Sequence, residues 1–326
     1  KDSYTAGNSI YAGYIATEYY PVAPLLVNLG VRYEISKQWV DYYTDGGKAE
    51  RSELNKNDLF PSLNMKYQMN EKNSLRFAFS RTVTRPSFIE MAPFLYQESY
   101  GSAQIRGNAD LQNGYNYNID LRYELFEKNG DMLSITAYYK HLKAPIERVQ
   151  TLSGGSAVHS FRNADNGMAT GVEIEFRKEI VKDLRFGVNG SYMYTNVKLP
   201  EGGAYTNSQR ALQGASPYLA NADLTYSPAF SNDRQLSVAL LYNLQGPRIH
   251  SVGISGLGDI KQQPVHTLNF TGSYRFNRRF AVKLQVNDLL NQDILFKQEV
   301  PTTGDKVEVE RFRKGTGFEV GFSYDL

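Results

Sequence analysis

Apolar and polar residues alternate along much of the chain. From Leu25 to Ile35 every odd-numbered residue is apolar, whereas the even-numbered positions include Asn28, Arg32 and Glu34. Successive side chains of a β-strand point to opposite faces, so this period of two predicts a strand with one apolar and one polar face. The pattern recurs to the end of the chain and predicts an all-β protein.

The predicted strands are long and numerous. Each runs for roughly 10–13 residues, whereas soluble strands average about 5–6 and a membrane-crossing strand needs about 9–11. About thirteen are expected, at residues 9–20, 24–36, 58–69, 73–83, 115–126, 131–142, 169–180, 184–196, 217–228, 234–246, 264–276, 279–291 and 316–326. These lengths favour strands that cross a membrane.

The connections between these strands alternate between short and long. Long ones are expected at residues 37–57, 84–114, 143–168, 197–216, 247–263 and 292–315, with some β character at 146–162 and 293–312. Short turns at one end and long loops at the other are typical of outer-membrane barrels. The sequence therefore predicts a transmembrane antiparallel up-and-down β-barrel. Because bacterial barrels close with an even number of strands, we expect further strands before Lys1 in the full protein.

Composition narrows the class of protein. A net charge of +2 gives no reason to expect nucleic acid as a partner, and the absence of cysteine excludes disulfides and thiol chemistry. No apolar run approaches the length of a membrane helix, and the first ten residues do not form a signal peptide. Several tyrosines near strand ends, among them Tyr139, Tyr192, Tyr194 and Tyr242, suit the aromatic girdles of a barrel.

Short motifs occur in a recognisable order. They lie at residues 11–14, 29–34, 60–63, 80–86, 106–111, 161–164, 170–173 and 287–291. Together they resemble the barrel of TonB-dependent outer-membrane receptors, particularly those of Bacteroidetes, with Ala109 and Leu290 replacing the usual Pro and Phe. The end of the chain resembles the assembly signal of outer-membrane proteins, carried here by Glu319, Gly321, Tyr324 and Leu326.

The resemblance implies both an architecture and a function. Such receptors have about 22 strands around a plug, so residues 1–326 would be the C-terminal portion of the barrel, without the plug domain and the early strands. It implies uptake of a scarce small nutrient across the cell outer membrane, with energy from the TonB complex reached through the plug. A surface lipoprotein caps some members. No cofactor is expected, and the nutrient stays open between siderophore, cobalamin, oligosaccharide and peptide.

Two groups of residues are candidates for functional roles. The charged face of the strands should line the lumen and hold a plug, because charge is costly on the lipid side; its members are Arg32, Glu34, Arg122, Glu173, Glu175 and Arg177. The long segment 84–114 should bind ligand through rings and a guanidinium; its candidates are Phe88, Phe94, Tyr96, Tyr100 and Arg106. The alternative is that these aromatic residues pack the loop on itself.

Other functions are alternatives to a transporter. The four histidines show no metal-ligand spacing, and no nucleophile elbow or phosphate loop is present, so neither a metal site nor an enzyme is predicted. A smaller complete barrel would be a porin or a barrel enzyme, for which His159, Ser160 and Asp165 are the conceivable catalytic residues. A soluble β-rich adhesin is the third alternative.

Overall fold

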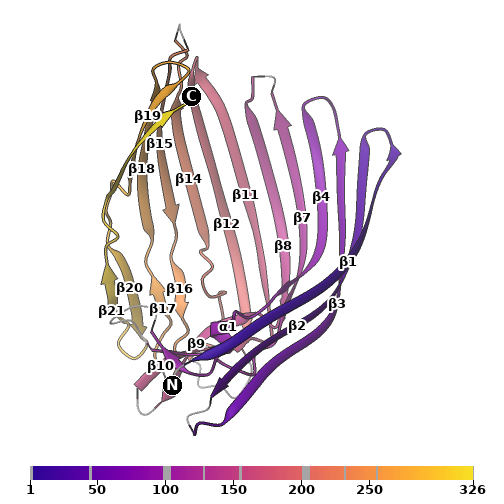
Figure 1. Cartoon of the computed structure of the whole chain (residues 1–326), viewed down its shortest axis with the longest axis vertical. Helices are drawn as coiled ribbons and strands as arrows, with labels where there is room; N and C mark the ends of the chain where they lie inside the picture. Colours follow the sequence, from indigo (N-terminus) through magenta and orange to yellow (C-terminus); the bar gives the residue numbers. More distant parts are fainter. Residues whose placement is uncertain are drawn as a thin grey trace.

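The computed structural model describes residues 3–43, 46–97, 104–127, 129–153, 156–199, 206–230, 233–254 and 256–325. Most of its strands form one wide antiparallel sheet (Figure 1). Strands that follow one another along this sheet pair as neighbours, so the topology is an up-and-down meander. Its strands are β1 Tyr4–Val22, β2 Leu25–Tyr43, β3 Ala49–Gln68, β4 Asn73–Thr84, β7 Gly114–Phe126, β8 Met132–Lys143, β11 Asn166–Val181, β12 Leu184–Lys198, β14 Tyr218–Tyr226, β15 Gln235–Gln245, β18 Val265–Arg275, β19 Phe280–Asn287 and β22 Gly317–Tyr324.

All thirteen predicted strands are confirmed, but several of their boundaries are wrong. The predicted loop 37–57 is largely strand, because β2 and β3 stay paired through Lys37↔Asn55 as far as Tyr43↔Ala49. A backbone ladder needs no apolar alternation, so pairing continues after the pattern ends. The predicted strand 279–291 stops at Asn287, because Asp288 takes a φ of 55° and turns the chain.

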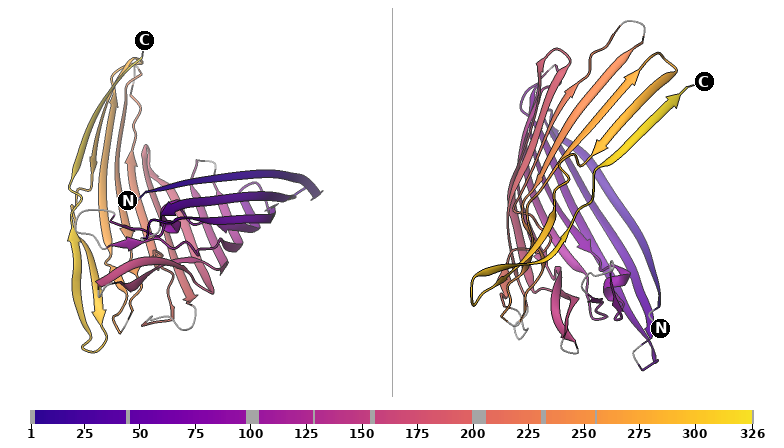
Figure 2. Two further views of the ribbon diagram at one scale, coloured as in Figure 1. Left: turned by 60° about the horizontal axis from the view of Figure 1, so that its bottom comes forward. Right: turned by 90° about the vertical axis from the view of Figure 1, so that its left-hand side faces the viewer.

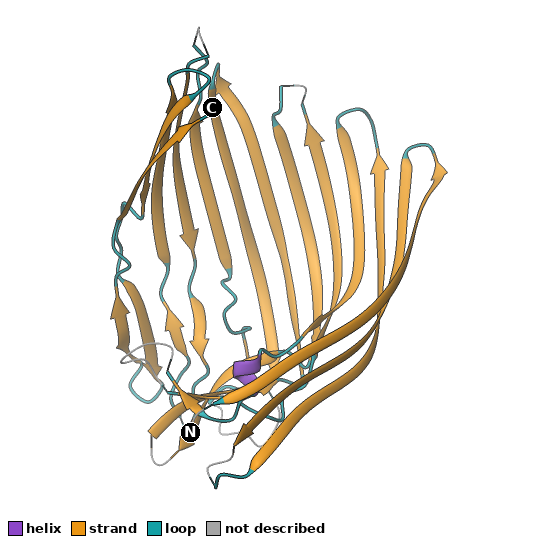
Figure 3. Cartoon of the chain, in the orientation of Figure 1, coloured by secondary structure: helices purple, strands orange, loops and turns teal. Residues whose placement is uncertain are grey.

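The sheet is strongly curved and open (Figure 2). Among the described strands, β1 and β22 form its two edges, each with one neighbour. The connections after β4, β8, β12, β15 and β19 are long and lie at one end of the sheet, where teal loops gather in Figure 3. The β2–β3 connection lies at the same end but is short, because both strands stay paired as far as Tyr43↔Ala49, so the prediction of a long loop there is wrong. The predicted alternation holds for the other connections, and we call the two ends the turn end and the loop end.

The loop end carries structure of its own. One small sheet contains β5 Leu95–Tyr96, β6 Ile105–Arg106, β10 Ser156–Asn163 and β9 Ile146–Ser153. A second contains β16 Arg248–Ser251, β17 Ile260–Gln262, β20 Ile294–Val300 and β21 Asp305–Phe312. The short strand β13, Gln209–Arg210, pairs with β12, and helix α1 spans Phe88–Met91. The β character expected at 146–162 and 293–312 therefore belongs to two loop hairpins.

The two faces of the sheet have different chemistry. Helix α1 lies against the even-numbered face of β2, where Gln38 Nε2 donates to the Pro86 carbonyl oxygen at 2.5 Å and Met91 packs against Val40 and Leu54. The inner face is therefore the one that bears Glu34 and Gln38. The outer face exposes large apolar side chains, among them Tyr11, Ile15, Ile174, Phe318 and Phe322. Among the described residues, no helix is long and apolar enough to span a membrane.

Candidate functional site

The inner face carries paired charges near the loop end of β2. Glu34 is 8% exposed and accepts hydrogen bonds from Arg32 Nε and Arg85 Nη2, both at 2.6 Å. Arg32 comes from the same strand, whereas Arg85 begins the long segment after β4. Glu34 thus ties that segment to the wall. The strand pattern predicts Arg32 and Glu34 as members of the charged face but not Arg85, because only the fold brings residues 34 and 85 together.

A second group of charges lies toward the turn end of the inner face. Glu124 Oε2 is 2.7 Å from Arg76 Nε, and its other oxygen is 2.9 Å from Arg122 Nε. Arg122 and Arg177 in turn flank Glu175, at 3.7 Å and 2.6 Å. Arg76 and Arg122 are direct cross-strand partners. A carboxylate beside them is needed, since like charges directly opposite each other destabilise a sheet.

Glu173 lies on this face beside a shallow hollow. It lines a cavity of ≈ 350 Å³ together with Arg122, Glu175 and Asn189. Glu173 is exposed and makes no ion pair among the described residues. The charged residues named from the sequence thus share one face and line a concave surface.

The aromatic residues of the predicted ligand loop pack mainly on the protein itself. Phe88 and Phe94 pack on the cluster around Val40 and Met91, and the Phe94 ring stacks on Tyr4 with centroids 5.6 Å apart. Tyr96 packs on a separate cluster with Ile105. These three residues are only partly buried, so each keeps some exposed surface.

Arg106 and Tyr100 complete the set of loop candidates. Arg106 is held in β6 opposite Leu95, whereas Tyr100 lies outside the described residues. Next to Arg106, Gly107 allows a close approach, because a Cβ there would lie 2.2 Å from the Ala92 carbonyl oxygen. This contact holds the returning segment against α1. A ligand-binding role for the loop set stays a prediction.

A buried ion pair lies at the centre of the loop end. Arg210 Nη2 is 2.8 Å from Glu147 Oε2, and the Gln213 N–H also donates to that oxygen, at 3.3 Å. Burial raises the pKa of the Glu147 carboxyl, while the Arg210 charge and the Gln213 amide act in the opposite direction. The pair joins β9 to β13 and thereby to β12. Nothing in the sequence pattern marked either residue.

Two histidines lie beside this pair. His159 is 3% exposed, its Nδ1 accepts a hydrogen bond from Arg148 Nε at 3.0 Å, and its ring lies 6.0 Å from that of His250. Burial, with the charge of Arg148 and the proximity of His250, lowers the pKa of His159 to about 3. Ser160 follows it on a strand and therefore points to the opposite face, and Asp165 is exposed beyond the strand. These residues form no triad.

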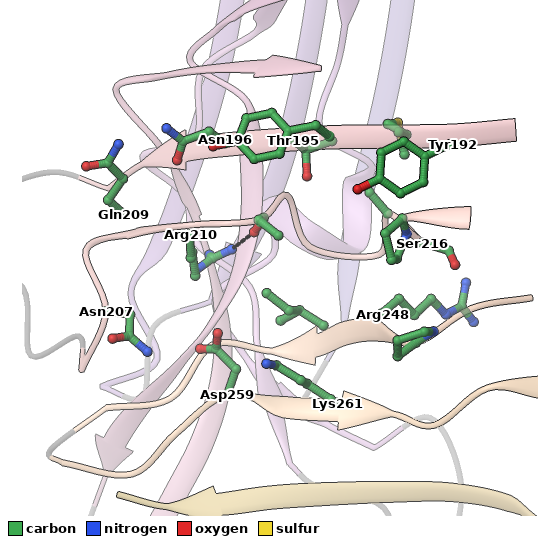
Figure 4. A pocket seen from close by; sticks show the side chains of 17 residues that line it. Tyr192, Thr195, Asn196, Asn207, Gln209, Arg210, Ser216, Arg248, Asp259 and Lys261 are labelled. Carbon is green, nitrogen blue, oxygen red and sulfur yellow. Dashed lines mark hydrogen bonds between the residues drawn. The ribbon is translucent and has the colours of Figure 1, made fainter. Parts of the chain in front are cut away.

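A cavity of ≈ 640 Å³ lies at the loop end, between the outward-facing tyrosines of β12 and the strands β16 and β17 (Figure 4). Tyr192 and Tyr194 line it and are 66% and 55% exposed. They alternate with Ser191, which faces inward as the cross-strand partner of Glu173. Arg248 and Lys261, from β16 and β17, lie across the cavity. The cavity exists because β14 begins only at Tyr218, which leaves an irregular segment between β12 and β16.

The predicted assembly signal lies in the last strand, β22. Glu319 and Gly321 face inward in β22, and Tyr324 faces outward and is 62% exposed. Leu326 lies outside the described residues, so the assembly signal stays a prediction. In the part of the chain that the structure describes, no group of three or more His, Asp or Glu side chains could hold a metal ion.

Comparison with known proteins decides the family. The outer membrane protein beta-barrel family matches residues 2–324. The chain belongs to this family. Its outer-membrane location and its β-barrel fold, both predicted from the sequence, are thereby confirmed, and the soluble adhesin is excluded.

The chain is similar to two receptors and a transporter. The ferric enterobactin receptor of Pseudomonas aeruginosa PAO1 is 21% identical over 270 residues, which cover 76% of this chain and 35% of that protein. The ferric yersiniabactin uptake receptor of Yersinia pestis superposes with a TM-score of 0.67 at 14% identity, over 98% of this chain and 46% of the receptor. A copper transporter gives a TM-score of 0.66 at 13% identity, over 97% of this chain and 48% of the transporter.

These matches confirm the predicted resemblance to receptor barrels. The chain spans about a third of the length of the curated relative and about half of the solved structures.

Proposed function

We propose that this chain is part of an outer-membrane receptor that takes up a scarce nutrient, and that the nutrient is a chelated metal ion. The observation that carries the proposal is the match over nearly the whole chain to proteins named for ferric siderophores and copper, one of them related in sequence. The fold supports it: a polar concave wall leads from a structured loop end to the turn end. Such a wall suits the passage of a polar molecule that membrane lipid excludes.

The inner-face charges suit a second part of the proposal, in which a plug region occupies the lumen. Glu34 already ties Arg85 to the wall, and Glu173 has no ion-pair partner among the described residues. Plug side chains would supply partners for such groups. We propose that TonB acts through that plug. A surface lipoprotein partner, implied by the resemblance, remains a prediction to be tested by co-purification.

An uptake assay tests the proposal. Deleting the gene in the native strain should abolish uptake of ⁵⁵Fe carried by one class of chelator, with a copper chelate as the parallel substrate. Deleting tonB should cause the same loss. Uptake that disappears with the gene but persists without tonB, across many small hydrophilic solutes, would establish the porin alternative. Substrate turnover by the purified protein would establish a barrel enzyme.

A further inference from the structure

The cavity beside Tyr192 and Tyr194 lies where the barrel wall leaves the apolar layer of the membrane. Along the outward row of β12, apolar Val188 is followed by Tyr192 and Tyr194 and then by Asn196. Thr170 of β11 pairs with Tyr194 on one side and Tyr139 on the other, so these two tyrosines lie at one height. Tyrosines at one height, between apolar and polar residues, mark the membrane–water interface.

The cavity extends from this tyrosine girdle toward the loop end. Tyr192 is the cross-strand partner of Tyr218, and Arg248 follows shortly after β15, whose last residue pairs with the neighbour of Tyr218. Arg248 and Lys261 therefore lie just beyond the girdle, at the height of lipid headgroups. Because Tyr192 and Tyr194 face outward, are exposed and line the cavity, the molecules next to it on that side are lipids of the outer leaflet.

Two cations, Arg248 and Lys261, outnumber the one uncompensated carboxylate of the cavity, Asp259. Arg210 is neutralised by Glu147, and Asp259 is 8% exposed with one oxygen bound by the Gly253 N–H at 3.0 Å. Arg248 donates from Nε to Gln262 at 2.7 Å, which uses one of its five donors. Among the described residues, neither Arg248 nor Lys261 makes an ion pair, and both are exposed.

This set of side chains fits a particular chemistry. Arg presents a planar fork that matches phosphate oxygens, and Lys is a point charge that binds phosphate. Asn196, Asn207 and Gln209 line the same cavity and offer amides for hydroxyl groups (Figure 4). Basic cavities on the flank of membrane proteins bind anionic headgroups in this way. We propose that the cavity binds the phosphate-bearing, hydroxyl-rich headgroup of an outer-leaflet glycolipid.

Native mass spectrometry of the full protein, purified from outer membranes in detergent, tests this proposal. The probe is diphosphorylated lipid A, and the same lipid A stripped of its phosphates is the comparison. We expect the phosphorylated lipid to bind at least tenfold more tightly. Equal binding of the two lipids would overturn the proposal.

Charge-removing variants locate the site. Arg248→Gln and Lys261→Gln should each weaken binding about fivefold, which corresponds to the ~1 kcal/mol that one cation near an anionic headgroup contributes. Lys143→Gln is the matched control, because Lys143 is an exposed cation on the outer face of β8 that does not line the cavity. Unchanged affinity in both cavity variants, or an equal loss in the control, would contradict the site.

A competition arm distinguishes the two sources of phosphate. Inorganic phosphate at millimolar concentration should leave lipid binding unchanged, because free phosphate gains none of the apolar contacts that the girdle tyrosines offer a lipid. If inorganic phosphate displaces the lipid and its own binding depends on Arg248, then the cavity is a site for soluble phosphate and the lipid proposal is wrong. Transport is measured separately, so loss of lipid binding with normal uptake leaves the proposed function intact.

Discussion

Arg210 Nη2 lies 2.8 Å from Glu147 Oε2, and the two side chains are only 4% and 1% exposed. Glu147 lies in strand β9 and Arg210 in strand β13, which belong to different loop-end segments. Their contact joins the β9–β10 hairpin to the wall at β12. Val149 and Val197 pack in one apolar cluster beside the pair. The loop end is therefore held by a buried charge pair as well as by apolar packing.

We expect Glu147→Gln to destabilise this loop end by about 3–5 kcal/mol, because it leaves the Arg210 charge buried without a partner. Hydrogen exchange of the amides around Val149 and Val252 should accelerate accordingly. Arg278→Gln is the control, since its ion pair with Asp233 is exposed and should contribute no more than about 1 kcal/mol. Exchange rates that change equally in the two variants would refute a structural role for the buried pair.

The buried histidine predicts a dependence of loop stability on pH. Folding holds His159 neutral by lowering its pKa from 6.5 to about 3. Between these values the opened loops bind a proton that the folded loops do not, so stability is lost as the pH falls below about 6.5. Once corrected for the intrinsic pH dependence of amide exchange, the protection of loop-end amides should fall between pH 7.5 and 5. His159→Gln should flatten this dependence, and an unchanged slope in that variant would assign it to other groups.

The inner-face ion pairs predict which carboxylate matters for the barrel. Glu124→Ala leaves Arg76 and Arg122 facing each other without a counter-charge and should destabilise the protein by about 2–3 kcal/mol. Glu173→Ala, on the same face, should change stability by less than about 0.5 kcal/mol because it breaks no ion pair among the described residues. Urea unfolding in lipid vesicles measures both. Equal midpoints would mean that the Glu124 contacts contribute nothing.

The orientation of the sheet is tested by placing a cation on either face. Ile174 faces outward near the middle of β11 and is 49% exposed, so Ile174→Lys should cost about 2–4 kcal/mol in the bilayer. Ser191 faces inward as the cross-strand partner of Glu173, so Ser191→Lys should cost less than about 1 kcal/mol. Refolding titrations into vesicles give both values. The reverse order would invert the assigned faces.

Much of the fold was predictable from the sequence because the alternation of apolar and polar residues marks each barrel strand and its two faces. Lipid accepts apolar side chains and the lumen accepts charged ones, so burial repeats with the period of the strand. The period alone predicts that Arg32, Glu34, Arg122, Glu173, Glu175 and Arg177 share one face of the strands, and the register of the sheet places them on one face. That this face lines a lumen and holds a plug stays a prediction. The thirteen strands followed from the same rule.

The sequence could not predict what depends on contacts between distant segments. Periodicity ends where strands leave the membrane, so it missed the extension of β2 and β3 and the small sheets of the loop end. It could not pair Glu147 with Arg210, 63 residues apart, or Glu34 with Arg85. The headgroup-level cavity arises only because β12 and β16 are separated by an irregular segment. Local pattern thus determined the wall, and long-range packing determined the loop end where ligands are expected to bind.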